Sequence, residues 1–163
     1  YMTLPSSALM TTQGTYTGQN IGANRLDRVK TGAKQTALIS EIISVCVLTA
    51  VFVFARPIVA AFGLGQEAVA YCSAHVRFVA LCLPLFASYF PLLGLFQGAN
   101  NALFSTFVAT GALTIRVTAT YLFQGLPGAG YHMIWWNTIF GWGLGFVISW
   151  THFLRGKWRS ASA

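Results

Sequence analysis

Charged residues are scarce in this chain of 163 residues, and acidic ones are almost absent. Asp and Glu together number 3, Lys and Arg number 10, and charged residues make up 8% of the sequence. Soluble domains carry about 25% charged residues. A surface with so few charges would not stay dispersed in water, so the composition excludes an ordinary soluble domain and favours a protein that faces lipid.

The residue patterns that support enzyme chemistry are also missing. The three cysteines, Cys46, Cys72 and Cys82, form no Cys-x-x-Cys pair and no metal-ligand spacing, so we expect them to be small apolar side chains. The sequence shows no recognisable nucleophile–base pair of a catalytic site. We therefore predict that the chain is not an enzyme and that it holds no metal or cofactor.

Long apolar stretches are the main feature that is present. A helix needs about 20 residues to cross a hydrocarbon core of about 30 Å, and five stretches reach that length. Strict alternation of apolar and polar residues, the signature of a membrane barrel, does not occur. The sequence therefore predicts an all-α, polytopic transmembrane helix bundle, with helices over residues 2–21, 35–55, 71–96, 103–123 and 134–154.

Basic residues gather in two clusters, one in a predicted loop over residues 22–34 and one after the last apolar stretch. They are Arg25, Arg28, Lys30 and Lys34, followed by Arg155, Lys157 and Arg159. Cytoplasmic connections attract Lys and Arg, and four crossings after an inner loop return the chain to the inside. We therefore expect a multi-pass protein of the inner membrane with a cytoplasmic C-terminus, and no nucleic-acid partner for the net charge of +7.

Small residues and prolines mark expected packing features. Glycines recur four residues apart, a spacing that lets helix backbones approach closely. They are Gly14, Gly18 and Gly22, then Gly94 and Gly98, then Gly141 and Gly145. Pro84 and Pro91 fall inside the third predicted helix and should kink it, either to give the helix its shape or to allow a bend that moves.

A few polar side chains interrupt the apolar stretches. Glu41 is the only acid within one; it could serve a cleft or couple an ion, or it could lie at the interface or pair with a base. Arg116 lies mid-helix and could tether helices or act in a gate or cleft. Gln13 and Gln97 could line a cleft, but the sequence does not show which way they face.

Several motifs together resemble the multidrug and toxic compound extrusion (MATE) transporters. Residues 18–28, GQNIGANRLDR, resemble the family's cytoplasmic loop motif, with Gly18, Gln19, Asn20, Gly22, Arg25 and Arg28 as its members. Residues 95–101, LFQGANN, resemble the turn after the family's tenth helix. Arg116 resembles the arginine of the eleventh, and residues 128–142 resemble the entry to the twelfth. The resemblance covers nearly the whole chain.

The resemblance implies a partial C-terminal lobe spanning residues 1–163, with helices eight to twelve of the family. The seventh helix and the N-terminal lobe would be missing partners, and a chain that begins with Tyr1 is expected to have a truncated start. The implied function is export of organic cations or drugs by antiport with H⁺ or Na⁺, which is a coupling ion and not a cofactor. Because residues 71–97 hold no Asp or Glu, no coupling carboxylate of the family carries over to this chain.

Two other interpretations stay open. A flippase for lipids or polysaccharide precursors, from the same superfamily, would share the architecture; it would have a basic cleft, whereas a cation exporter should have an acidic or aromatic one. The chain could also be a non-transporting membrane fragment that is stable only with a partner subunit.

Overall fold

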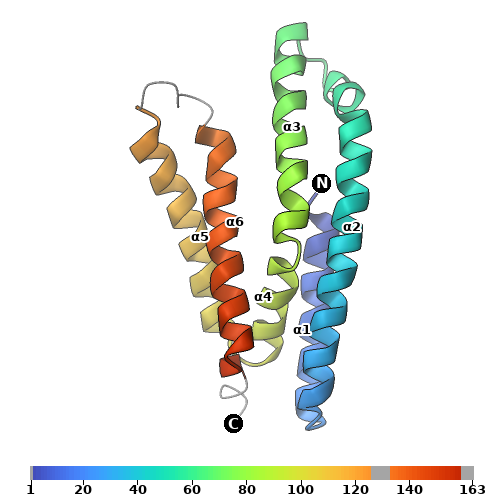
Figure 1. The fold of residues 1–163 in the computed structure, drawn as a ribbon, viewed down its shortest axis with the longest axis vertical. Helices are drawn as coiled ribbons and strands as arrows, with labels where there is room; N and C mark the ends of the chain where they lie inside the picture. Colours follow the sequence, from blue (N-terminus) through green and yellow to red (C-terminus); the bar gives the residue numbers. More distant parts are fainter. Residues whose placement is uncertain (1, 126–132, 159–163) are drawn as a thin grey trace.

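The computed structural model describes residues 2–125 and 133–158, and within them the chain forms helices and no strand. This confirms the predicted all-α bundle. Figure 1 shows α5 and α6 side by side and a second group formed by α1 to α4. The helices are α1 (Leu4–Gly22), α2 (Leu26–Ala60), α3 (Gln66–Phe86), α4 (Tyr89–Gly98), α5 (Ala102–Phe123) and α6 (Met133–Leu154).

The outer surface of the bundle is apolar. Among the described helices, α2, α3 and α5 are long and apolar enough to cross a membrane. Large side chains such as Leu103 and Phe107 are about three-quarters exposed, at 76% and 74%. Because water would penalise so much exposed apolar area, the chain is a membrane protein.

The described parts of both basic clusters lie at the same end of the bundle. The turn between α1 and α2, which contains Arg25, and the end of α6, which precedes Arg155, both lie at the bottom of Figure 1. The turn between α4 and α5 lies there as well. This arrangement agrees with the helix count from which the sequence placed both basic clusters on one side.

The predicted loop over residues 22–34 is wrong, because α2 begins at Leu26 and leaves a connection of residues 23–25. Val29 and Ala33 are buried against Leu92 and Phe96 of α4. Their spacing of four residues puts them on one face of a helix. Packing of that face therefore keeps the segment helical despite its basic residues, and Arg28, Lys30 and Lys34 lie exposed on the first turns of α2.

The predicted third helix over residues 71–96 is also wrong as a single element, because α3 and α4 are separated at Ala87 and Ser88. In a continuous helix the carbonyl of Ala87 would accept from the amide of residue 91. Pro91 has no such donor. The hydroxyl of Ser40 on α2 donates to this carbonyl instead, at 2.8 Å. The break is thus stabilised by a neighbouring helix.

Helices α1 and α4 end in the same way. Asn24 and Asn100 each adopt a left-handed conformation, with φ of 56° and 59°. The amides of Asn24 and Arg25 bond back to the carbonyls of Ile21 and Asn20, and the amides of Asn100 and Asn101 repeat the pattern. This is the Schellman helix end. The shared sequence Gly-Ala-Asn at 22–24 and 98–100 produces it twice.

Candidate functional site

Helices α1 and α4 cross in direct backbone contact at paired glycines. Gly14 lies opposite Gly94, and Gly18 lies opposite Gly98. A Cβ atom added to Gly94 would overlap the carbonyl of Met10, and one added to Gly98 would overlap the carbonyl of Gly14. The predicted close approach at four-residue spacing is confirmed for these four positions. This crossing with α4 positions α1, the helix that carries Gln13.

The other predicted glycines have different surroundings. Gly22 has nothing near the position of an added Cβ. The side-chain stem of Arg116 and the backbone carbonyl of Ala112 lie against Gly141 on α6, and the ring of Tyr89 lies against Gly145. The lack of a Cβ atom at these two glycines of α6 therefore leaves space for the side chains of Arg116 and Tyr89.

Gln13 is fully buried, with 1% of its surface exposed, and forms a polar tie between α1 and α2. Its Oε1 accepts a 2.6 Å hydrogen bond from the hydroxyl of Thr36 on α2, and its Nε2 donates to the hydroxyl of Thr17 at 3.1 Å. A cavity of about 140 Å³ adjoins it, lined also by Tyr16 and Gly32. Gln13 thus faces the interior, and its amide is occupied by threonine hydroxyls.

Arg116 is the centre of a polar network between α5 and α6. Its Nε donates to Oδ1 of Asn137 at 3.3 Å. The carbonyl of Arg116 accepts from the hydroxyl of Thr120 at 2.8 Å, and that hydroxyl accepts from Nδ2 of Asn137 at 3.4 Å. The network ties the two helices, and Arg116 as a whole residue is half-buried.

Two cavities adjoin Arg116. The first, of about 470 Å³, is also lined by Thr120, Tyr121 and Gln124 of α5 and its following turn and by Asn137 of α6. No Asp or Glu lines it among the residues that the structure describes. The charge at this cavity is therefore positive.

The second cavity, of about 290 Å³, is bounded by four helices and lined mainly by apolar residues, of which three are aromatic; we call it the aromatic cavity. Met10 of α1, Tyr89 and Phe90 of α4, and Trp142 of α6 line it together with α5 residues that include Arg116. The ring centroids of Phe90 and Trp142 lie 5.9 Å apart in a T-shaped pair. Aromatic faces bind organic cations through their quadrupole. Sequence reasoning missed Tyr89, Phe90 and Trp142 as a group, because they become neighbours only when α4 meets α6.

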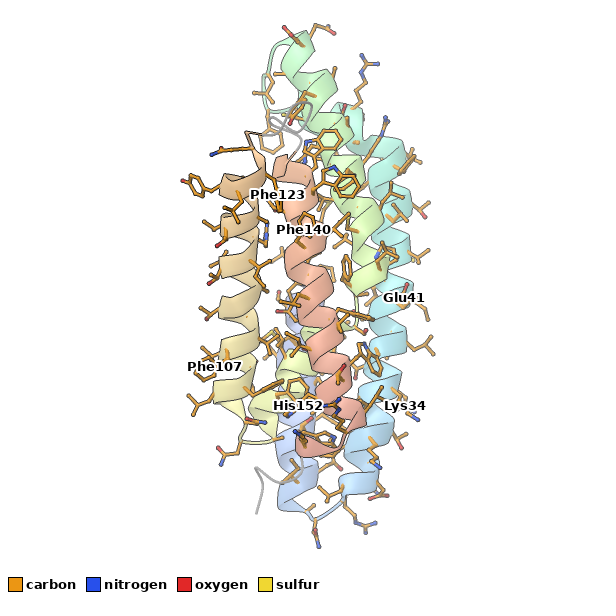
Figure 2. All side chains as sticks on the ribbon, turned by 60° about the vertical axis from the view of Figure 1, so that its left-hand side comes forward. Lys34, Glu41, Phe107, Phe123, Phe140 and His152 are labelled. Carbon is orange, nitrogen blue, oxygen red and sulfur yellow. The ribbon has the colours of Figure 1, made fainter. Side chains whose placement is uncertain are left out.

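Glu41 lies on α2 near the middle of the bundle's height and on the outer side of that helix, above Lys34 in Figure 2. Its side chain is half-buried. It directly follows Ser40, whose hydroxyl holds the break between α3 and α4. The structure therefore separates Glu41 from Arg116 and its cavities and places it at the level of the break.

Gln97 lies exposed near the end of α4. Its Nε2 donates to the hydroxyl of Ser105 on α5 at 3.3 Å, and that hydroxyl donates to the carbonyl of Leu93 at 3.3 Å. Gln97 thus helps to join α4 to α5 across the turn between them, some distance along α4 from the aromatic cavity at Tyr89.

The loop motif forms a compact helix end. Nδ2 of Asn20 donates to the carbonyl of Tyr16 at 2.8 Å, and the hydroxyl of Tyr16 donates to the carbonyl of Arg28 at 3.4 Å. The ring of Tyr16 also fills the space above Gly32. Gly18, Gln19, Gly22 and Arg25 are exposed. Tyr16 and Gly32, outside the motif as it was read from the sequence, thus fasten it to α2.

Other clusters of chemistry-bearing residues are few. Within residues 2–125 and 133–158, no three His, Cys, Asp or Glu side chains come together in a way that could hold a metal ion. Part of the predicted resemblance, residues 128–132, lies outside the described residues. The polar network and the two cavities at Arg116 are therefore the strongest candidates for a functional site.

Comparison with known proteins gives one match. The family model described as MatE matches residues 1–122 of this chain. No curated protein and no solved structure matches it. The matched range includes α1 to α4 and nearly all of α5, and thus covers Gln13, Glu41, Gln97 and Arg116.

Proposed function

Because the chain belongs to the MatE family of membrane transporters, we propose that it is part of a secondary active transporter that exports organic cations or drugs. Export would be driven by antiport with H⁺ or Na⁺. The chain would form a partial C-terminal lobe in the inner membrane, with its C-terminus in the cytoplasm, and an N-terminal lobe would complete the cleft.

The aromatic cavity among α1, α4, α5 and α6 is the observation that carries this proposal. Tyr89, Phe90 and Trp142 offer ring faces and edges around a space of about 290 Å³, which is near the lower limit of small-ligand sites. A flat organic cation fits such a lining by cation–π attraction of about 0.5–2 kcal/mol for each favourable contact.

A transport assay tests the proposal. The complete protein, as cells make it, would be reconstituted in vesicles, and efflux of a fluorescent organic cation would be followed after a pH or Na⁺ gradient is imposed. Trp142→Ala should raise the KM for the dye roughly threefold or more, by the loss of one cation–π contact. Trp136→Ala is the matched control, since Trp136 is half-exposed and does not line the cavity. Equal KM values in both variants would contradict the proposal.

A second candidate function is supported by Arg116. It is the charged side chain at both cavities among the described residues, and a guanidinium recognises phosphate through paired hydrogen bonds. This favours a flippase for a phosphorylated lipid or polysaccharide precursor. In a cation exporter Arg116→Gln should leave dye efflux unchanged or faster, whereas in a flippase the same variant should abolish movement of a labelled phospholipid between leaflets.

The chain could also be inactive by itself. A fragment that needs a partner subunit would show no dye efflux when only these 163 residues are reconstituted. Efflux by vesicles that contain this polypeptide alone would exclude that interpretation.

A further inference from the structure

Another cavity, remote from Arg116, lies between the start of α5 and the end of α6. Its volume is about 230 Å³. Its lining includes two cations, Arg155 and Lys157, and three large apolar side chains, Phe104, Val147 and Ile148. Figure 2 shows His152, which also borders it, near the lower end of α6, close to the level of Phe107. The cavity thus combines cations with an apolar wall at one end of the bundle.

The apolar and the basic side chains that line the cavity follow one another along α6 and the turn after it. Val147, Thr151 and Arg155 are spaced four residues apart and therefore share one face of the helix. At about 1.5 Å per residue, Arg155 lies about 12 Å farther along the axis than Val147. Apolar side chains thus lie deeper in the bundle, and cations lie at its end. An anionic lipid has the same order, with acyl chains deep and a phosphate at the interface.

The inner wall of this cavity is rigid. The ring of His152 stacks on Phe104, with centroids 3.7 Å apart and planes at 19°. Its Nε2 lies 3.3 Å from Nδ2 of Asn101, at the turn between α4 and α5. The ring of Phe96 meets His152 at its edge, at 5.1 Å. The cavity wall is thus fixed by helices α4, α5 and α6 before any ligand binds.

The charge at this cavity suits an anion. The chain holds three acidic side chains, Asp27, Glu41 and Glu67, and none of them lines the cavity. The hydroxyl of Thr151 donates to the carbonyl of Val147 at 2.7 Å, so it is not the donor for a ligand. Binding would rest on Arg155 and Lys157, which are both exposed.

The surroundings of the cavity face lipid. Leu103 and Phe107 on α5 are 76% and 74% exposed, and Leu154 on α6 is 74% exposed. Such large apolar side chains next to basic ones define a surface that contacts acyl chains and headgroups together. From these observations we propose that this cavity binds the phosphate of an anionic glycerophospholipid, with an acyl chain along Val147 and Ile148.

A binding assay tests this site independently of transport. The complete protein in a neutral detergent would be titrated with a fluorescent phosphatidylglycerol, with phosphatidylcholine as the neutral comparison. The double variant Arg155→Gln/Lys157→Gln should bind phosphatidylglycerol roughly tenfold more weakly. The matched control is Arg25→Gln/Arg28→Gln, which removes two exposed cations from the same end of the bundle; it should change binding less than twofold.

Three outcomes would overturn the proposal. The Arg155/Lys157 variant could bind as tightly as the parent, or the Arg25/Arg28 control could lose as much affinity, which would indicate attraction by overall charge. Competition by glycerol phosphate alone at the concentration at which the lipid competes would identify a phosphate site and not a lipid site. Unaltered melting temperatures of both variants would show that any change in binding does not come from unfolding.

Discussion

The hydroxyl of Ser40 on α2 and the carbonyl oxygen of Ala87, between α3 and α4, form a hydrogen bond of 2.8 Å in the interior of the bundle. Ser40 is 2% exposed and Ala87 is 3% exposed, so water cannot replace this bond. Because Pro91 cannot donate to Ala87, one serine stabilises a helix break that the sequence of α3 and α4 creates.

Removal of this hydroxyl should therefore destabilise the protein. Ser40→Ala leaves a buried carbonyl without a donor, which costs about 1–3 kcal/mol, and the melting temperature in detergent should fall. Ser44→Ala is the matched control, since the hydroxyl of Ser44 bonds to the carbonyl of Glu41 on its own helix. An equal fall in both variants would show that the bond to Ala87 has no special role.

Addition of a methyl group at the crossing of α1 and α4 should also destabilise the bundle. Gly98→Ala puts a Cβ atom into the Gly14 carbonyl, and overpacking of this kind costs about 1–3 kcal/mol. Gly22→Ala, at the end of α1 and away from the crossing, meets open space; it should leave stability unchanged or raise it, because alanine favours helix by about 1 kcal/mol. In thermal unfolding, the melting temperature should thus fall for Gly98→Ala and should stay the same or rise for Gly22→Ala. An equal fall in both variants would contradict the close crossing.

The hydrogen bond between the buried Gln13 and the half-buried Thr36 predicts a thermodynamic coupling. Thr36→Val removes the donor to Gln13 Oε1 and should cost about 1–3 kcal/mol, whereas the double variant Gln13→Leu/Thr36→Val replaces both polar partners and should recover part of that loss. Thr31→Val is the control, since the hydroxyl of Thr31 bonds to the carbonyl of Asp27 at the exposed start of α2. Additive effects in the double-mutant cycle would contradict the prediction.

Glu41 provides a test of ion coupling. If this carboxylate senses the coupling ion beside the break between α3 and α4, Glu41→Gln should abolish the dependence of dye efflux on the pH or Na⁺ gradient while the protein still folds. Glu67→Gln is the matched control, because Glu67 lies exposed in the first turn of α3. Efflux by the Glu41 variant that still follows the gradient would assign Glu41 a structural or interfacial role.

The apolar stretches and turn residues of the sequence predicted the limits of those helices whose ends depend on nearby residues alone. Helices α1, α5 and α6 begin and end within a few residues of their predicted limits. The basic segment at residues 26–34 was predicted as a loop because charge suggested a connection. It is helical because Val29 and Ala33 bury one face against α4, a contact between segments far apart in the sequence.

The sequence by itself determined that this chain is an all-α membrane protein of the MatE family, because composition, helix length and motif residues are local properties. The tertiary structure alone decided which polar side chains meet. Gln13 faces Thr36, Arg116 faces Asn137, and Ser40 reaches Ala87. The side-chain direction at each of these positions depends on how helices cross, and the crossings are set by paired glycines and by the break before Pro91.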